Sequence, residues 1–207
     1  GNDEKGDFIV DYYKRLGGID VNYIQRTSEL PTSATILPIR PNGDRPALHQ
    51  RGASDKFFVK EEDFDDVCRA KVLHHGGTGL LRDMDESGQS AKLMAFAKSR
   101  GLTTTLDLIA PNDETLNLLK PILPHVDYFM PSMEEAYQIS RQNTPAEASK
   151  FFLDLGAGAC IFKWGEKGSF VKTHSNEFRL PAFAVQVKDT TGCGDAYCGG
   201  FVAGLCK

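Results

Sequence analysis

The chain has 207 residues, of which 41% are hydrophobic and 25% are charged, values typical of a globular protein with a sizeable core. The formal net charge of −4 argues against a nucleic-acid partner, because proteins that bind nucleic acids usually present a basic face. No apolar run is long enough to cross a bilayer, so we expect no membrane partner.

The cysteines indicate the redox compartment. There are five, an odd number, and none lies in a CxxC pair or at the spacing of zinc ligands. Reduced thiols in a cytoplasmic protein are therefore the expected state. Cys193 and Cys198 lie within a glycine-rich motif near the end of the chain, and packing is the role that we favour for both.

Before residue 70 the pattern predicts a helix and three strands. The expected helix spans 6–18, and the expected strands span 20–26, 33–39 and 45–52. Asn42-Gly43 lies between the last two strands and is a strong signal for a hairpin turn.

After residue 70, strand and helix patterns alternate. The expected strands cover 70–77, 102–109, 126–131 and 157–164, and the expected helices cover 87–101, 111–120, 132–140 and 144–156. Such alternation predicts an α/β fold whose mostly parallel sheet has helices on both faces. Two short strands over 168–173 and 177–183, which we expect to be antiparallel, precede the glycine-rich motif.

The motif DTTGCGDAYCGG, residues 189–200, leads into a helix pattern. Ligands of open parallel sheets gather at the carboxyl ends of the strands, where Gly192 and Gly194 would let backbone N–H groups approach an anion. Asp195 would lie in the first helical turn, placed to accept a proton from an alcohol. Alternatively, Asp195 only complements the helix dipole and the glycines only permit close packing. Neither a Walker A motif nor GxGxxG occurs, which argues against P-loop and dinucleotide sites.

The segment DTTGCGDAYCGGFVAG resembles the second signature of the PfkB-type carbohydrate kinases, with Cys193 in place of the usual alanine. The similarity extends along the whole chain. PSMEEA resembles the Asn-x-x-Glu motif of the family with Ser132 for the asparagine, and FKWGEKGSF resembles the strand and turn beside the nucleotide. The resemblance implies a ribokinase-like fold with a core over 1–31 and 56–207 and a β-hairpin lid over 32–55.

The resemblance also implies an ATP-dependent sugar kinase that uses Mg²⁺. Asp195 is the implied general base that contacts the sugar hydroxyl, and the amides of Gly192, Cys193 and Gly194 are the implied anion hole. The other implied contacts are with the nucleotide (Thr190, Thr191, Lys163, Gly165, Gly168 and Asn112), with the sugar (Gly52 and Ala53) and, through water, with magnesium (Glu135).

Some of these assignments have structural alternatives. Ser132 with Glu135, and Thr144 with Glu147, have the spacing of a helix capping box, so Glu135 is either a capping partner or an organiser of magnesium. Asn112 is likewise either a capping residue or a phosphate contact.

Two other functions remain open, a nucleoside kinase of the same fold and a non-catalytic ligand-binding relative. The lid segment has few aromatic residues to hold a purine, which disfavours the nucleoside kinase. Lid hairpins of this type often pair, so the resemblance suggests a homodimer through the lid. The resemblance also leads us to expect that segments completing the sugar and nucleotide sites lie outside this chain.

Overall fold

The computed structural model describes residues 1–40 and 46–207, so the predicted Asn42-Gly43 turn lies outside the described residues. The chain forms two compact units. The first comprises Gly1–Phe58 with Leu80–Met84, and the second comprises Val59–Gly79 with Asp85–Lys207. The boundaries of these units differ from those expected for the core and the lid. The lid over 32–55 stays a prediction.

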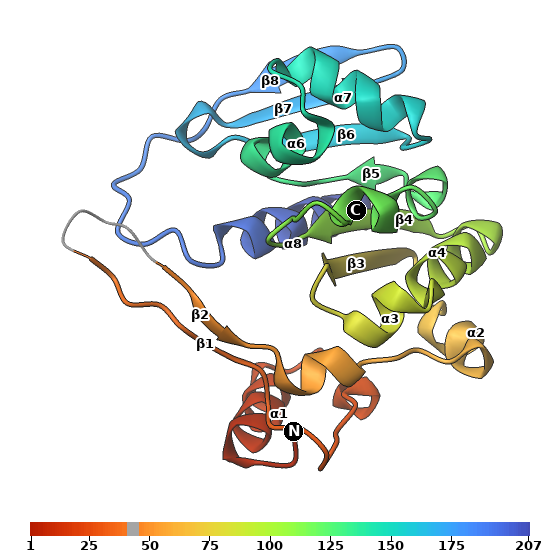
Figure 1. Ribbon diagram of the computed structural model, residues 1–207, viewed down its shortest axis with the longest axis vertical. Helices are drawn as coiled ribbons and strands as arrows, with labels where there is room; N and C mark the ends of the chain where they lie inside the picture. Colours follow the sequence, from red (N-terminus) through yellow and green to blue (C-terminus); the bar gives the residue numbers. More distant parts are fainter. Residues whose placement is uncertain (41–45) are drawn as a thin grey trace. The chain divides into compact units, whose positions relative to one another are not determined.

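The first unit begins with helix α1, Glu4–Leu16, as predicted (Figure 1). The carboxylate of Asp3 caps this helix by accepting the N–H of Gly6 at 2.9 Å. It also accepts the hydroxyl of Thr32 at 2.6 Å and the N–H of Thr32 at 2.7 Å. These hydrogen bonds, the Thr32 hydroxyl first, hold the pKa of Asp3 well below its ordinary value.

The strand predicted over 20–26 is wrong. Val21–Tyr23 forms a 3-10 turn instead, and the side chain of Asp20 accepts the N–H of Asn22 at 3.0 Å. An aspartate that bonds to the backbone two residues on favours a turn over extended backbone, and this local bond overrides the short apolar pattern.

The predicted hairpin is present in the first unit. Strands β1, Ala34–Ile36, and β2, Leu48–Gln50, pair antiparallel, with Ala34 opposite Gln50. Both strands are shorter than the expected 33–39 and 45–52. A 3-10 turn over Gly52–Lys56 follows β2.

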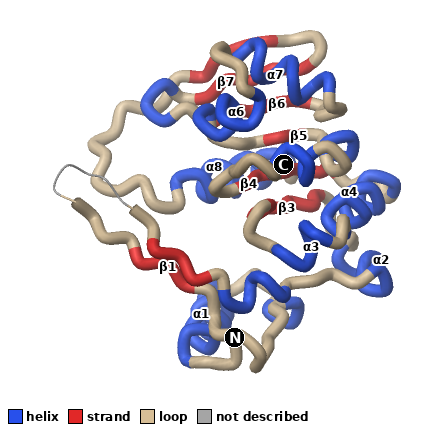
Figure 2. The backbone as a smooth tube through the Cα atoms, viewed as in Figure 1, coloured by secondary structure: helices blue, strands red, loops and turns tan. Residues whose placement is uncertain are grey.

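The second unit is built on a six-stranded sheet with the order β3-β4-β5-β6-β7-β8 (Figures 1 and 2). The first four strands are parallel neighbours: β3 Val72–Thr78, β4 Thr103–Leu108, β5 Tyr128–Phe129 and β6 Ala159–Lys163. Strands β7, Ser169–Thr173, and β8, Glu177–Leu180, are antiparallel. The predicted mostly parallel sheet is therefore confirmed.

Helices flank this sheet on both faces, as predicted. They are α2 Phe64–Val67, α4 Gln89–Ser99, α5 Thr115–Leu119, α6 Met133–Ser140, α7 Pro145–Asp154 and α8 Cys193–Leu205, and α3, Arg82–Glu86, spans the boundary between the units. Along the described ranges, no helix is both long and apolar enough to cross a bilayer.

Alternation along the strands separates the two faces. Cys160 and Phe162 of β6 face one core, in which side chains of α4, α5, α6 and α7 are buried. Ile161, between them, faces a smaller cluster that contains Cys198 of α8. Successive strand residues point to opposite faces of a sheet, so α8 covers the face opposite to α4–α7.

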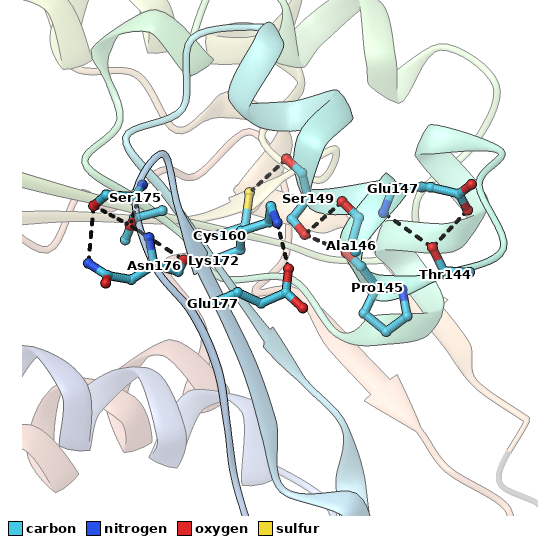
Figure 3. A network of polar contacts seen from close by, with 11 residues as sticks. Thr144, Pro145, Ala146, Glu147, Ser149, Cys160, Lys172, Ser175, Asn176 and Glu177 are labelled. Carbon is cyan, nitrogen blue, oxygen red and sulfur yellow. Dashed lines mark hydrogen bonds and ion pairs between the residues drawn. The ribbon is translucent and has the colours of Figure 1, made fainter.

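The helix starts confirm part of the capping pattern. The hydroxyl of Thr144 accepts the N–H of Glu147 at 3.2 Å and donates to the Glu147 carboxylate at 2.7 Å (Figure 3). Cys160 links β6 to α7 through its thiol, which donates to the carbonyl of Ser149 at 3.6 Å. The contact of the Cys160 thiol therefore joins α7 to the sheet.

Candidate active site

The loop before α8 is shaped by its own side chains. The carboxylate of Asp189 accepts the N–H of Thr191 at 2.9 Å and its hydroxyl at 2.8 Å. Gly192 follows with φ of 76°, in the left-handed region that favours glycine, and α8 begins at the next residue. The motif therefore folds as the predicted turn into a helix.

The amides of this turn are only partly free. The N–H of Cys193 donates to the carbonyl of Thr190 at 3.2 Å, so this amide is used inside the loop. The N–H groups of Gly192, Gly194 and Asp195 have no acceptor among the described residues. The loop folds back on the Cys193 amide, and the anion hole expected from Gly192, Cys193 and Gly194 stays a prediction.

Asp195 lies in the first turn of α8 and its side chain is exposed. Its carboxylate has no hydrogen-bond or ion-pair partner in the part of the chain that the structure describes. A Cβ built on Gly192 would lie 4.0 Å from Asp195 Oδ2, so the carboxylate lies over the glycine turn. Bare amides and an ionisable oxygen therefore share one helix N-terminus, where the helix dipole favours an anion.

A polar cluster lies between this turn and the sheet. Lys163 Nζ, at the end of β6, lies 2.5 Å from Asp107 Oδ2 of β4. The thiol of Cys198 donates to the same Asp107 oxygen at 3.3 Å. A Cβ built on Gly194 would be 3.5 Å from Lys163 Nζ, which places the lysine directly beneath the turn.

The surroundings of this cluster shift the pKa values of Cys198 and His74. Burial raises the pKa of the Cys198 thiol to about 12, with Asp107 adding to the effect. His74 of β3 shares a 2.7 Å hydrogen bond with the hydroxyl of Thr105. Burial lowers the pKa of His74, and the Asp107 charge opposes that effect. Both thiol and imidazole are therefore held neutral near pH 7.

The segment predicted to lie beside the nucleotide includes Lys163 and continues into the turn after it. Gly165 and Gly168 have φ of 52° and 86° and bound a 3-10 turn. A Cβ on Gly168 would lie 1.9 Å from the carbonyl oxygen of Leu180, whereas no described residue lies within 4 Å of one built on Gly165. Gly168 is thus required by packing against the end of β8 and the residues directly after it.

The start of α6 reaches the same edge of the sheet. Lys163 donates its backbone N–H to the carbonyl of Pro131 at 3.0 Å and forms a parallel bridge with Ser132. Ser132 and Glu135 form the complete capping box. One oxygen of Glu135, Oε2, accepts the Ser132 N–H at 2.7 Å, and the other has no partner among the described residues.

Asn112 lies in the loop between β4 and α5. Its side-chain oxygen accepts the N–H of Glu114 at 2.8 Å, and its backbone N–H donates to the Thr115 hydroxyl at 2.9 Å. This is the local bonding expected of a residue that shapes a helix start, and the phosphate contact of Asn112 stays a prediction.

The predicted sugar contacts, Gly52 and Ala53, belong to the first unit. The N–H of Ala53 donates to the carbonyl of Pro31 at 2.8 Å. A Cβ on Gly52 would lie 2.3 Å from that same oxygen, so glycine permits this close approach. Contact of these residues with a sugar stays a prediction.

The residues at the starts of α6 and α8 have the chemistry expected of a site for a nucleotide and Mg²⁺. Three amides without an acceptor among the described residues, at a helix N-terminus with a lysine beneath them, suit the phosphate chain of a nucleotide. The described residues contain no group of three or more His, Cys, Asp or Glu side chains that could hold a metal. The oxygen of Glu135 that its capping box leaves unused suits Mg²⁺, which usually keeps several waters and takes few protein ligands beside substrate phosphates.

Sequence reasoning missed the pairing of Asp107 with Lys163. The two residues are 56 positions apart, so their spacing along the chain does not indicate that they meet. Period-two alternation places both on the α8 face, but only the strand order shows that β4 and β6 are separated by a single strand.

Comparison with known proteins identifies the family. The family model described as "pfkB family carbohydrate kinase" matches residues 1–207 of this chain. The chain therefore belongs to the pfkB family of carbohydrate kinases, as the sequence motifs predicted.

Individual relatives cover the chain almost completely. It is 39% identical over 218 residues to the ATP-dependent 6-phosphofructokinase of Thermoanaerobacterium thermosaccharolyticum, covering 100% of this chain and 65% of the relative. It is 26% identical over 216 residues to fructokinase-2 of Oryza sativa subsp. japonica, covering 100% and 64%. It is also similar to the crystal structure of a putative ribokinase II from E. coli in complex with ATP and Mg²⁺, with 25% identity, a TM-score of 0.81, and coverage of 98% and 67%. The chain thus spans roughly two thirds of the length of these proteins.

Proposed function

We propose that the protein is an ATP-dependent sugar kinase in which Asp195 removes the proton from the acceptor hydroxyl. One observation carries this proposal. The exposed Asp195 carboxylate, without a partner in the described chain, lies in the same helical turn as the unpartnered N–H groups of Gly194 and Asp195 itself. Membership of the pfkB family supports the same reaction.

In this reaction the acceptor oxygen gives its proton to the Asp195 carboxylate while it forms a bond to the γ-phosphorus of ATP. The bond between that phosphorus and the β-phosphate oxygen breaks, and ADP leaves with the electron pair. ATP supplies the phosphoryl group when bound. The free amides at the start of α8 donate to the oxygens that carry charge during transfer, and the helix dipole adds to their effect. Catalysis of phosphoryl transfer rests mainly on such alignment and charge stabilisation.

The remaining roles are proposed around this centre. Glu135 keeps one carboxylate oxygen outside its capping box, and this oxygen is available to a water of Mg²⁺. The residues proposed to lie along the nucleotide are Thr190, Thr191, Lys163, Gly165, Gly168 and Asn112. Gly52 and Ala53 are proposed to contact the sugar.

The comparison favours a particular acceptor class. Identity to the ATP-dependent 6-phosphofructokinase is 39%, against 26% for fructokinase-2 over a span of similar length. We therefore propose a phosphorylated ketohexose, fructose 6-phosphate first, as the acceptor, ahead of a free hexose.

A homodimer through the hairpin remains the proposed assembly, supported by exposed apolar side chains such as Ile36 of β1 and Leu48 of β2.

A substrate panel tests this function. The full-length protein is incubated with Mg·ATP and with fructose 6-phosphate, fructose, ribose, an acidic sugar or adenosine, and ADP release is followed. We expect the highest kcat/KM for fructose 6-phosphate. Turnover of a free sugar alone would reassign the acceptor, and the absence of acceptor-dependent ADP release throughout would contradict the kinase and favour a ligand-binding relative.

A further inference from the structure

The ion pair of Lys163 and Asp107 joins two strands that are not neighbours. β5 lies between β4 and β6, and the register places Thr105, Tyr128 and Ala159 in one row across them. Asp107 lies two residues beyond this row and Lys163 four residues beyond it. Both therefore point to the α8 face, and the long lysine side chain reaches back over β5 to the carboxylate.

The ion pair is mostly removed from solvent, and α8 packs over it. The side chains of Lys163 and Asp107 are 15% and 13% exposed, so water screens their attraction weakly. Cys198 contacts both partners, at 3.3 Å from Asp107 Oδ2 and 3.9 Å from Lys163 Nζ. Gly194 lies four residues before Cys198, on the same side of the helix. The first turn of α8 thus rests on the ion pair through Gly194 and Cys198, with Asp195 beside them.

A lysine in this place has no evident stabilising role for the helix itself. The N-terminus of a helix carries partial positive charge, so an ammonium beneath it is unfavourable without a counter-ion. Asp107 supplies that counter-ion at 2.5 Å. Buried pairs of this kind can often be replaced by apolar side chains without loss of stability, which points to a role other than holding the fold.

We propose that Lys163 and Asp107 are positioning residues that fix the first turn of α8, and hence the Asp195 carboxylate and the Gly194 amide, for phosphoryl transfer. This inference rests on the proposed kinase function. The pair acts through the helix turn that it supports, and it sets the distance between the base and the amides that stabilise the transferred group.

The experiment replaces both charges at once, with Lys163→Met and Asp107→Leu in the same full-length protein. Because no charge is left unpaired, we expect a melting temperature close to that of the wild type. We expect kcat to fall by about 10- to 100-fold, since a displacement of about 1 Å costs this much. Loss of the proposed contact between Lys163 and the nucleotide would raise KM for ATP in addition, without lowering kcat. The ion pair of Lys172 and Glu177 on β7 and β8, also 2.5 Å apart, provides the matched control (Figure 3). The variant Lys172→Met with Glu177→Leu should keep the kcat of the wild type.

The outcomes separate this inference from the proposed function. If the wild-type protein has no kinase activity, the proposed function fails. If the wild type is active and the folded double variant keeps its kcat within twofold, the positioning role is wrong. A loss of kcat equal to that of the control variant, or a change confined to KM for ATP, also overturns it.

Discussion

Ser132 and Glu135 bond to each other in both directions at the start of α6. The N–H of Ser132 donates to Glu135 Oε2 at 2.7 Å, and the N–H of Glu135 donates to Ser132 Oγ at 3.2 Å. The same glutamate is the residue that the family motif assigns to magnesium. Capping uses one carboxylate oxygen, so a capping role and a role towards a magnesium-bound water are compatible in one side chain.

The variant Glu135→Gln separates these two roles. Glutamine preserves the capping box, so we expect the melting temperature to stay within about 2 °C of the wild type. It removes the negative charge, so we expect the Mg²⁺ concentration at half-maximal turnover to rise several-fold. Titration of turnover against free Mg²⁺ measures this shift.

The control for this variant is Ser132→Ala, which removes the cap but keeps the carboxylate. It should cost about 1 kcal/mol of unfolding free energy and leave the magnesium dependence nearly unchanged. An unchanged magnesium titration in Glu135→Gln would leave Glu135 with the capping role alone.

Two glycines in the same turn should respond differently to alanine. At Gly168 an added Cβ meets the carbonyl of Leu180 at 1.9 Å and φ is 86°, so Gly168→Ala should destabilise the second unit by roughly 3 kcal/mol or more. At Gly165 an added Cβ has no described residue within 4 Å, and the φ of 52° is unfavourable, so Gly165→Ala should cost about 1 kcal/mol. Urea unfolding of both variants measures the difference. Equal losses would show that the close contact at Gly168 does not form.

His75 should make stability depend on pH. This side chain is buried, its Nε2 has no hydrogen-bond partner among the residues that the structure describes, and burial lowers its pKa to about 4. Between pH 6.5 and 4, His75 is protonated in the unfolded chain but stays neutral in the folded chain. The free energy of unfolding therefore falls as the pH falls through this window. The contribution between pH 7 and pH 5 is about 2 kcal/mol.

The variant His75→Leu should lose this part of the pH dependence. Urea unfolding at pH 7 and pH 5 measures it, and the exposed His174 provides the control substitution His174→Leu. The free energy difference between the two pH values should shrink by about 2 kcal/mol in His75→Leu only. The same difference in wild type and variant would rule out a buried neutral imidazole.

Much of the second unit could be predicted from sequence because its elements are locally determined. Alternating apolar runs define β3, β4 and β6, and hydroxyl and carboxylate caps define the starts of α6 and α7. The strand expected over 20–26 was wrong because one side-chain bond from Asp20 decides that segment.

The candidate site was predictable only in part. The glycine turn before α8 follows from the motif, because Gly192 must take a positive φ. The engagement of the Cys193 amide depends on how the loop folds back, and the pairing of Lys163 with Asp107 depends on strand order. The spacing of residues along the sequence predicts neither of these two contacts. The functional roles of individual residues come from the family resemblance and stay proposals.

Single-turnover phosphoryl transfer by Asp195→Asn in the full-length protein tests the central claim most directly. Asparagine keeps the shape of the side chain but cannot take the proton, so the rate of product formation should fall by roughly 10²- to 10⁴-fold. Nucleotide affinity measured by calorimetry should stay within a few-fold of the wild type. The exposed Asp113, which pairs with Arg141, gives the control Asp113→Asn with an unchanged rate. A single-turnover rate in Asp195→Asn that matches the wild type would contradict the role of Asp195 as the base.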